Sequence, residues 1–572
     1  MEPKRERLVV RQGGAPVLLA RVCRQLRIRR IVNAMVEWDP RQCKVSPGTL
    51  VVALILNMLV AREPLYTVKE FYRRRDLGLL FEEPVEVDAL NDDALGRTLD
   101  RLAAIDLPQL VQSVGLSAVH LGEMEVRSVH ADTTSVSVYG EFEPTVGDEK
   151  FVEAHPEKRL LKITHGHSKQ RRPDLKQFIS GLIVSKQGVP LMGTIGDGNL
   201  SDKVWNREMI ESLERSFLDP RSVAYVVDSS LVTVKNLQRM DQSKVRFISR
   251  LPETFKAAGE VRAKAFVENR WQPIGRLART RWNGAFYHAV SYRHELAGGT
   301  YRLTVVRSSS LDKRKEKKLE RLIRTEQEAM KRAAKELMGQ RFNCQADAEA
   351  ALAAFQKAHE DALHTTRGLV VAYTEEKRPR GRPRKDAVYP KQTHYQVEIR
   401  LFAPSEEAKK AWLERESAFV LISNLPEDKW SDAALLEEYK GQTQVEQGFR
   451  VYKHPIVDDG IFLKSTRRVE AFAYVATLAL MVAAFLEYRV RQELQKTETK
   501  KLRLLRGARV TDSPTSLALL EEIDYIPVLG SLTPEGYSRY ADVADDLPEE
   551  HLEILRLAGF GPEIYFEPLV SN

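Results

Sequence analysis

Five polar residues in the C-terminal third of the chain have a spacing that could place them on one side of a helix. Tyr439, Gln442, Glu446, Arg450 and Lys453 follow one another at intervals of three, four, four and three residues. At 3.6 residues per turn, these intervals predict one narrow stripe. A stripe that faces a core is apolar, whereas this one carries an acid, an amide, a phenol and two cations. One carboxylate among phosphate-binding groups suits metal-assisted cleavage of a phosphodiester.

The region that begins at Val126 predicts where partner acids lie. Strands are expected at 126–139, 178–184, 189–195, 222–227 and 246–249, and helices at 202–217 and 234–240. This order matches a ribonuclease-H-like α/β core, in which the first and fourth strands are neighbours. Asp132 lies within the first strand and Asp228 ends the fourth, so their carboxylates are expected to converge. His130 shares a strand face with Asp132, where it either lines the site or, more often for histidine, packs in the core.

Asp132, Asp228 and Glu446 are the expected metal ligands. Two-metal phosphoryl transfer uses acidic oxygens to hold two cations about 3.5–4 Å apart, one activating the nucleophile and one stabilising the leaving oxygen. Magnesium prefers oxygen ligands and keeps water in its shell, so two aspartates and a glutamate suffice. An isolated acid at any of these positions is more often a cap or a solvated charge. The prediction therefore depends on the three together.

Bulk properties agree with a nucleic-acid-binding protein but do not require one. A chain of 572 residues predicts several domains, because single cores rarely grow past about 250–300 residues. A net charge of +8 and a pI near 9.1 are compatible with DNA binding. Three cysteines without metal-ligand spacing predict neither disulfides nor a zinc site. The N-terminus has no hydrophobic signal region, and the apolar run at 471–486 is shorter than the ~20 residues of a spanning helix, so we expect a buried helix and no membrane segment.

The fold class expected is multidomain: a helical N-terminal domain and a ribonuclease-H-like core that a large mixed α+β insertion interrupts. The regions are the N-terminal domain at 1–125, the core at 126–254 and 416–500, the insertion at 255–415, and a C-terminal region at 501–572. The basic N-terminal helices are typical of a helix-turn-helix DNA-binding domain or, equally, of a dimerisation or packing domain. In the insertion, the charged run at 311–338 is most simply a solvated helix pair, with a DNA-facing role as the alternative.

Two basic segments are candidate DNA contacts. Residues 378–385 read Arg-Pro-Arg-Gly-Arg-Pro-Arg-Lys, and their centre resembles an AT-hook, in which Arg380 and Arg382 would enter a narrow A·T minor groove. A basic flexible linker is the alternative. Lys169 and Arg172 lie on a turn between core strands, where they could hold the DNA backbone or form a solvated basic turn.

These motifs together resemble the DDE transposases of bacterial insertion sequences. Within that group the chain is similar to the insertion-sequence family 4 superfamily, whose hallmark is Tyr-(2)-Arg-(3)-Glu-(6)-Lys. Tyr439, Glu446 and Lys453 stand in register, and Gln442 occupies the arginine position. Further segments resemble the branch typified by the family 1634 elements: 130–134, 166–169, 172–175, 198–202 and 250–252. The resemblance runs from about residue 15 to 490.

The resemblance implies a transposase that binds the inverted-repeat ends of its insertion sequence and catalyses strand cleavage and strand transfer. Its acids would bind two Mg2+ ions, with Mn2+ able to substitute, and its partners would be double-stranded DNA ends and target DNA. Four side chains would contact the DNA: Tyr439, Gln442, Arg450 and Lys453. Holding two ends implies at least a homodimer on DNA, in the bacterial cytoplasm at the nucleoid. The alternatives are a domesticated transposase that acts in DNA binding or regulation, and a two-metal nuclease without strand transfer.

Overall fold

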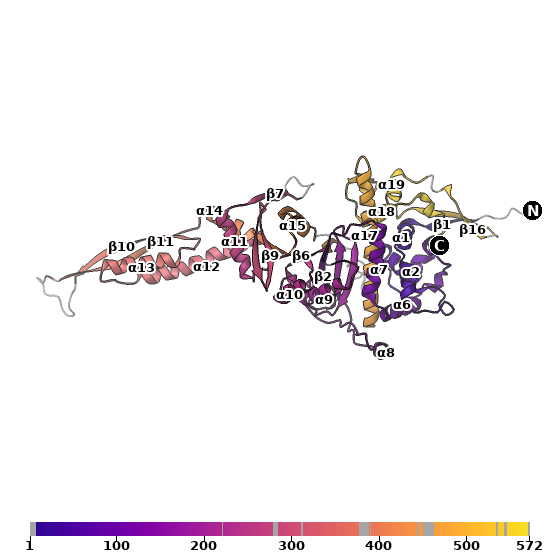
Figure 1. Cartoon of the computed structure of the whole chain (residues 1–572), viewed down its shortest axis with the longest axis horizontal. Helices are drawn as coiled ribbons and strands as arrows, with labels where there is room; N and C mark the ends of the chain where they lie inside the picture. Colours follow the sequence, from indigo (N-terminus) through magenta and orange to yellow (C-terminus); the bar gives the residue numbers. More distant parts are fainter. Residues whose placement is uncertain are drawn as a thin grey trace, which may run out of the picture. The chain divides into compact units, whose positions relative to one another are not determined.

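The computed structural model describes most of the chain from residue 7 to residue 569 (Figure 1). The residues not described are 1–6, 220, 278–283, 311–312, 377–387, 389, 443–444, 450–462, 534–535, 543–545 and 570–572. The chain divides into two compact units, and both contain helices and strands. Unit 1 comprises Met1–Arg250, Glu295–Tyr301 and Ser423–Asn572, and unit 2 comprises Leu251–His294 and Arg302–Ile422. A multidomain protein of mixed α and β content is therefore confirmed.

Five strands in unit 1 carry the two predicted aspartates. They are β2 (Ser128–Val138), β3 (Lys176–Ser185), β4 (Pro190–Gly196), β5 (Ala224–Val227) and β6 (Arg246–Arg250). Their order in the sheet is β4-β3-β2-β5-β6. β3 pairs antiparallel with β2 and β4, and β5 pairs parallel with β2 and β6. Each strand lies where the sequence predicts it, to within two residues at either end, and the predicted contact between the first and fourth strands is confirmed by the β2–β5 pairing.

Two helices connect the later strands, α9 (Asp202–Glu214) and α10 (Val234–Gln242). Trp205 anchors α9 to the sheet, because its buried indole N–H donates a hydrogen bond to Thr194 Oγ1 on β4 at 2.7 Å. The ring lies so close to β3 that a Cβ at Gly181 would be 2.3 Å from it. Glycine at this position therefore permits the helix to approach the strand.

The predicted buried helix is confirmed as part of α17 (Thr466–Lys496). Its side chains share one hydrophobic core with helices from both ends of the chain. Among the described residues, α17 is the one helix long and apolar enough to cross a membrane, or one of up to two spans if the pair formed by α6 and α7, bent by 95°, is counted. Of its most apolar 18-residue window, 83% is buried inside the structure, as for the core helix of a globular unit.

The N-terminal region is helical, as predicted, apart from its first strand. Its helices are α1 (Gly14–Gln25), α2 (Ile28–Met35), α3 (Pro47–Val60), α4 (Val68–Arg73), α5 (Leu77–Leu80), α6 (Asp92–Ala104) and α7 (Leu107–Leu121). Ser46 and Asn91 cap α3 and α6 by accepting hydrogen bonds from the third residue onward. These helices pack on α17, and a helix-turn-helix role stays a prediction.

Both ends of unit 1 meet in a small sheet that the sequence did not predict. β1 (Arg7–Gln12) pairs antiparallel with β15 (Pro527–Thr533), which pairs with β16 (Gly536–Arg539). The unit also contains α8 (Val146–Ala154), α15 (Asp432–Lys440), β13 (Leu502–Leu504), β14 (Arg509–Thr511), α18 (Ser516–Ile523) and α19 (Glu549–Leu557). The C-terminal region therefore packs with the N-terminal helices.

Unit 2 is built around a long hairpin and two helices. Its elements are α11 (Lys256–Glu268), β7 (Gln272–Arg276), β8 (Phe286–Leu296), β9 (Gly299–Ser308), α12 (Lys313–Met338), α13 (Gln345–Ala358), β10 (Thr365–Glu376), β11 (Lys391–Phe402), α14 (Glu406–Ser417) and β12 (Phe419–Ser423). β10 and β11 pair antiparallel along their whole length, and α12 and α13 pack on them through a small apolar cluster. The charged run is thus one helix with a buried apolar stripe and an otherwise solvated surface.

Candidate active site

Asp132 lies on β2, and Asp228 directly follows the end of the neighbouring parallel strand β5. The β2–β5 ladder pairs His130 with Val226 and Ala131 with Val227, and the next residue along the chain is in each case one of the two aspartates. Neighbouring strands lie about 4.8 Å apart, and paired residues point to the same face. The structure therefore brings these two acids together.

Asp132 is held in surroundings that disfavour its charge. Burial raises the pKa of its carboxyl to about 6; the charges of Asp228 and Asp202 act in the same direction, while Lys169 opposes them. Its Oδ1 accepts a hydrogen bond from the Thr133 N–H at 2.7 Å and lies 3.7 Å from Lys169 Nζ. A pKa raised by burial and by like charges is typical of functional carboxyl groups.

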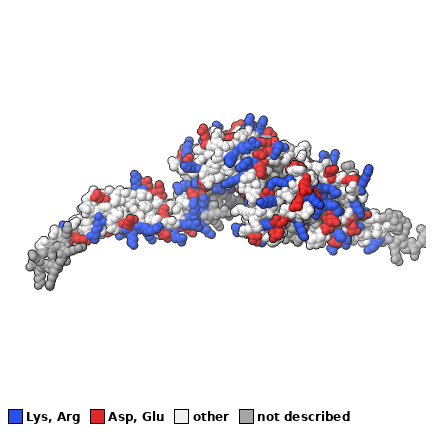
Figure 2. All heavy atoms as spheres, turned by 90° about the horizontal axis from the view of Figure 1, so that it is seen from below, with Lys and Arg blue, Asp and Glu red and all other residues white. Residues whose placement is uncertain are grey.

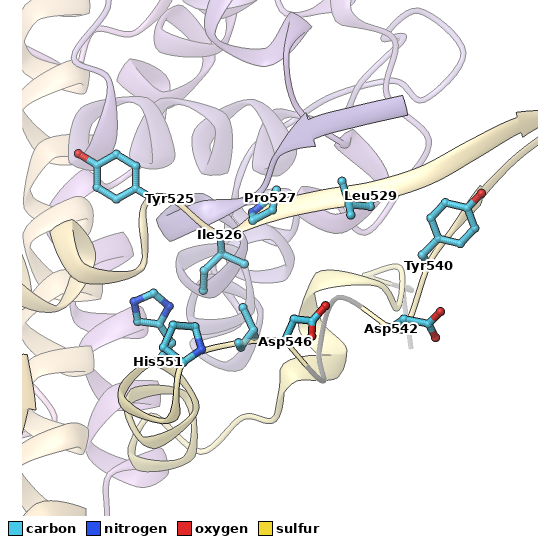
Figure 3. Close-up of a pocket in the computed structure, with 10 residues that line it drawn as sticks. Tyr525, Ile526, Pro527, Leu529, Tyr540, Asp542, Asp546 and His551 are labelled. Atoms are coloured by element: carbon cyan, nitrogen blue, oxygen red, sulfur yellow. The ribbon is translucent and has the colours of Figure 1, made fainter. Parts of the chain in front are cut away.

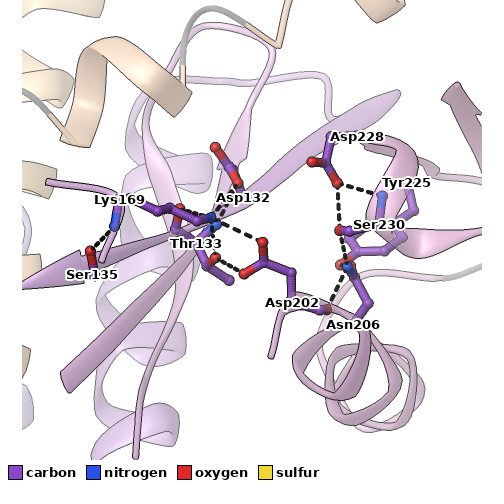
Figure 4. A network of polar contacts seen from close by, with 9 residues as sticks. All are labelled: Asp132, Thr133, Ser135, Lys169, Asp202, Asn206, Tyr225, Asp228 and Ser230. Atoms are coloured by element: carbon purple, nitrogen blue, oxygen red, sulfur yellow. Dashed lines mark hydrogen bonds and ion pairs between the residues drawn. The ribbon is translucent and has the colours of Figure 1, made fainter. Parts of the chain in front are cut away.

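Lys169 joins Asp132 to a further acid, Asp202 (Figure 4). Its ammonium lies 3.2 Å from Asp202 Oδ2 and donates to Thr133 Oγ1 at 2.7 Å, and the threonine hydroxyl donates to Asp202 Oδ1 at 2.5 Å. Asp202 is the first residue of α9. The ion pair with Lys169 is a role that no local pattern indicates, since the three residues are distant in sequence. The predicted contact of Lys169 with DNA stays a prediction, and its ammonium is engaged within the protein.

Asp228 is oriented by the turn that follows β5. Its Oδ1 accepts hydrogen bonds from the Ser230 N–H at 2.9 Å and from Ser230 Oγ at 2.5 Å. Asn206 of α9 donates to the same serine at 3.0 Å, and the buried Tyr225 hydroxyl donates to Asn206 at 3.2 Å. Figure 4 shows this chain of contacts running from the carboxylate to α9. The carboxylate direction is thus set by groups on three elements.

The prediction of one continuous helix across 439–453 is wrong at Gly441. α15 (Asp432–Lys440) ends there, 441–442 form a turn, and helical structure resumes at 445–449. The last turn of α15 tightens, because the Gly441 N–H bonds two successive carbonyls of the helix at 3.1 and 3.0 Å. The predicted stripe is therefore divided between two helical segments.

Tyr439, near the end of α15, is partly buried. The phenol packs beside Leu435 against the apolar cluster under α15. Burial raises its pKa to about 12; the charges of Asp228 and Glu446 add to the effect, and Arg250 opposes it. The phenol is therefore within electrostatic range of both carboxylates. Glu446 itself is exposed.

Sequence reasoning missed a buried acid beside this site, Glu438. It is 4% exposed, and its Oε1 accepts hydrogen bonds from Ser128 Oγ at 2.5 Å and from His130 Nε2 at 2.8 Å. Its Oε2 accepts from Lys186 Nζ at 3.0 Å. Burial opposes ionisation, but the donors outweigh it and lower the pKa of the carboxyl to about 2. The interpretation of His130 as a packed, hydrogen-bonded histidine agrees with this geometry.

A divalent cation could be held by Asp132, Asp228 and Glu446. Within the described ranges, no group of three or more His, Cys, Asp or Glu side chains already stands at metal-binding spacing. The donor set still fits magnesium, because it consists of carboxylate oxygens whose mutual repulsion a cation would relieve. The exposed Glu446 is the one of the three that would have to move inward.

The predicted DNA contacts have different outcomes. Arg172 is exposed, and its guanidinium donates three hydrogen bonds to Asp174, at 2.9, 3.1 and 2.7 Å. Gln442 is half-exposed in the turn after α15. The other predicted contacts lie outside the described residues: Arg380, Arg382, Arg450 and Lys453. On the face drawn in Figure 2, lysines and arginines form several small groups with acids between them.

A cavity of about 530 Å³ lies elsewhere in unit 1 (Figure 3). It is lined by β15, by Tyr525 just before that strand, by Tyr540 just after β16, and by the start of α19, including His551. Its lining contains none of the residues predicted to do chemistry. It is therefore separate from the candidate active site.

Comparison with known families reaches only the N-terminal helices. Residues 16–116 match a family model described as a domain of unknown function (DUF4277). This match covers α1 to α6 and part of α7, and none of the acids described above. No curated protein matches the sequence significantly.

Proposed function

We propose that this chain is a DDE-type transposase that binds the inverted-repeat ends of its insertion sequence and catalyses Mg2+-dependent strand cleavage and strand transfer. The observation that carries the proposal is the adjacency of Asp132 on β2 and Asp228 at the end of the parallel strand β5. Two acids from neighbouring strands and a third from a later helical segment make a donor set suited to two-metal phosphoryl transfer.

The strand layout supports the same proposal. Three antiparallel strands are followed by a helix, a parallel strand, a second helix and a further parallel strand. β2 lies at the middle of the order β4-β3-β2-β5-β6. This is the arrangement expected of a ribonuclease-H-like core. In such a core the acids at the centre would meet at one end of the parallel pair.

The proposed reaction requires the carboxyl groups in their charged form. Bound Mg2+ would supply Lewis-acid stabilisation of the phosphoryl oxygens and lower the pKa of the attacking water. Asp132 would give up its proton on loading, since a cation reverses the effect of burial and like charges. Lys169 would keep Asp202 aligned beside it. Water attack on the DNA would free a 3′-hydroxyl, and that hydroxyl would attack the opposite strand or a target phosphate.

Glu446→Gln tests the proposal. Incubated with Mg2+ and duplexes carrying the ends of the DNA segment that encodes the chain, the variant is expected to lose end cleavage by at least about 10³-fold, since a metal ligand contributes several kcal/mol to the transition state. Binding of the ends is expected to remain. Glu437→Gln is the matched control, because Glu437 is an exposed glutamate on α15.

Retained cleavage by the Glu446→Gln variant would overturn the assignment of the third acid. Joined DNA products from the unsubstituted chain distinguish transposition from simple hydrolysis. Cleavage without joined products would instead indicate a nuclease. The number of chains in the complex with two ends tests the proposed dimer.

A further inference from the structure

We propose that Glu438 and Gly441 together position Glu446 opposite Asp132 and Asp228, an inference that rests on the proposed function. Neither residue would touch DNA or metal. They would instead set the place at which the chain leaves α15 and enters the segment that carries Glu446. Three features support this positioning role: the buried carboxylate of Glu438, the close contact of Gly441 with His130, and the face of β2 that both residues contact.

Apolar packing alone does not explain Glu438. Leu435, on the preceding turn of α15, already packs against Ala224, Val226 and Ile248 of the sheet. Such contacts hold a helix on a sheet but are non-directional, so they do not determine its position along a strand. A buried carboxylate costs several kcal/mol in desolvation, which an apolar side chain at 438 would avoid. Holding α15 on the sheet therefore does not explain why an acid, rather than an apolar residue, stands at position 438.

Directional hydrogen bonds explain the acid at position 438. Glu438 Oε1 receives bonds from Ser128 at 2.5 Å and from His130 at 2.8 Å. Residues 128, 130 and 132 alternate onto one face of β2, so each step of two residues moves about 6.7 Å toward Asp132. Because two donors on successive positions of one strand face meet one oxygen, α15 is fixed in register with the strand that carries Asp132.

Gly441 transmits this register to the next segment. It ends α15, and its backbone passes directly over the His130 ring: a Cβ at 441 would lie 3.0 Å from His130 Cε1 and 3.0 Å from the Glu438 carbonyl oxygen. Glycine has no Cβ, so the turn can lie against β2. Residues 445–449 then begin four residues later, with Val445 and Phe449 buried and Glu446 turned outward.

Metal-directed backbone cleavage tests the inference without relying on DNA chemistry. Fe2+ with ascorbate, loaded onto the full chain in place of Mg2+, generates radicals that cut the backbone near bound iron, and carboxylate oxygens also accept iron. In the unsubstituted chain we expect fragments ending near residues 132, 228 and 446. In Glu438→Ala we expect the cuts near 446 to fall about 10- to 100-fold relative to the others, as for groups that orient metal ligands.

Gly441→Ala is the second variant, because it removes no buried charge and keeps an allowed backbone, with φ of −62°. We expect the same selective loss of cutting near 446, with a thermal unfolding curve close to that of the unsubstituted chain. Gly448→Ala is its matched control: a Cβ there would meet Leu480 at an ordinary 3.6 Å, so its cutting pattern should not change. Glu438→Gln, which keeps an acceptor for His130, should be intermediate.

The outcomes separate two failures. If Glu438→Ala and Gly441→Ala fold and give the unsubstituted cutting pattern, neither residue positions Glu446, and the inference is overturned while the metal site stands. If the unsubstituted chain gives no cuts near 132 and 228, the metal site itself is absent, and the proposed function falls with the inference. A global loss of cutting in Gly441→Ala alone would also overturn selective positioning.

Discussion

Asp132 and Glu438 are acids of one neighbourhood whose surroundings act on them in opposite directions. Asp132 faces two other aspartates, and its pKa is raised to about 6 by burial and by their charges. Glu438 is more deeply buried, yet its pKa is lowered to about 2, because Ser128, His130 and Lys186 donate to its two oxygens. Burial alone therefore does not decide the charge of a carboxyl group; the supply of donors does.

The difference separates a supporting region around Glu438 from the candidate active site around Asp132. Around Glu438 the polar groups satisfy one another, which stabilises the fold and fixes geometry. Around Asp132 stand two other aspartates, and in the described part of the chain Lys169 is shared between Asp132 and Asp202, so the charged form is left short of partners. Such a local excess of one charge lowers stability and is typical of sites that await a ligand of the opposite sign. Changes at the two acids should therefore have opposite effects on stability.

The largest effect is expected from Glu438→Ala. Removing one partner of a buried ionic network leaves the other donors unsatisfied, which typically lowers the free energy of unfolding by about 3–5 kcal/mol. Urea unfolding at pH 7 measures the loss. Lys186→Met, which removes the half-exposed donor, should cost much less. A loss below about 1 kcal/mol in Glu438→Ala would show that the network is not important for stability.

The pH dependence of the same position sharpens this prediction. The pKa of Glu438 is lower in the folded chain than in the unfolded chain, so its ionised form stabilises the fold above about pH 4.5, and this contribution disappears as the pH falls toward 2. The difference in unfolding free energy between the unsubstituted chain and Glu438→Gln should therefore shrink over that interval. A constant difference would contradict the lowered pKa.

Asp132→Asn is expected to have a smaller effect of the opposite sign. The folded chain raises the pKa of Asp132, so ionisation destabilises the fold as the pH rises from about 4 through 6. At pH 7 the variant should be more stable by about 2 kcal/mol, and the gain should vanish below about pH 4. Urea unfolding at pH 4 and pH 7 measures this. Mg2+ should reduce the difference in unfolding free energy between the two chains at pH 7, because it should stabilise only the unsubstituted chain.

Asp174→Asn is the matched control for this variant, because Asp174 is an exposed aspartate of unit 1 outside the acid cluster. It should show no such gain at pH 7. A destabilised Asp132→Asn at pH 7, with or without Mg2+, would mean that the carboxylate is already well partnered. The contrast between Asp132 and Glu438 would then disappear.

The candidate active site around Asp132 was largely predictable from the sequence, and the hydrogen-bonded region around Glu438 was not. Asp132 and Asp228 follow from the order of strands, since the pairing of the first with the fourth strand brings them together. Glu438 could not be found, because Ser128 and His130 lie far away in sequence and a lone acid on a helix is normally solvated. The helix end at Gly441 had a signal, since glycine within a helical pattern often marks a C-cap. The polar residues of the stripe are evenly spaced across Gly441, and this spacing favoured one continuous helix over a helix end at the glycine.

Arg172 offers the smallest expected effect on stability and a test of charge at the surface. Both Arg172 and its partner Asp174 are exposed, so Arg172→Ala should leave the urea unfolding midpoint unchanged. If the arginine contacts a DNA phosphate, as the sequence predicts, the variant should reduce the slope of log binding constant against log salt by about one. Asp174→Ala is informative in the other direction, since it releases the guanidinium and should strengthen DNA binding. Unchanged salt slopes in both variants would mean that the pair is only a surface ion pair.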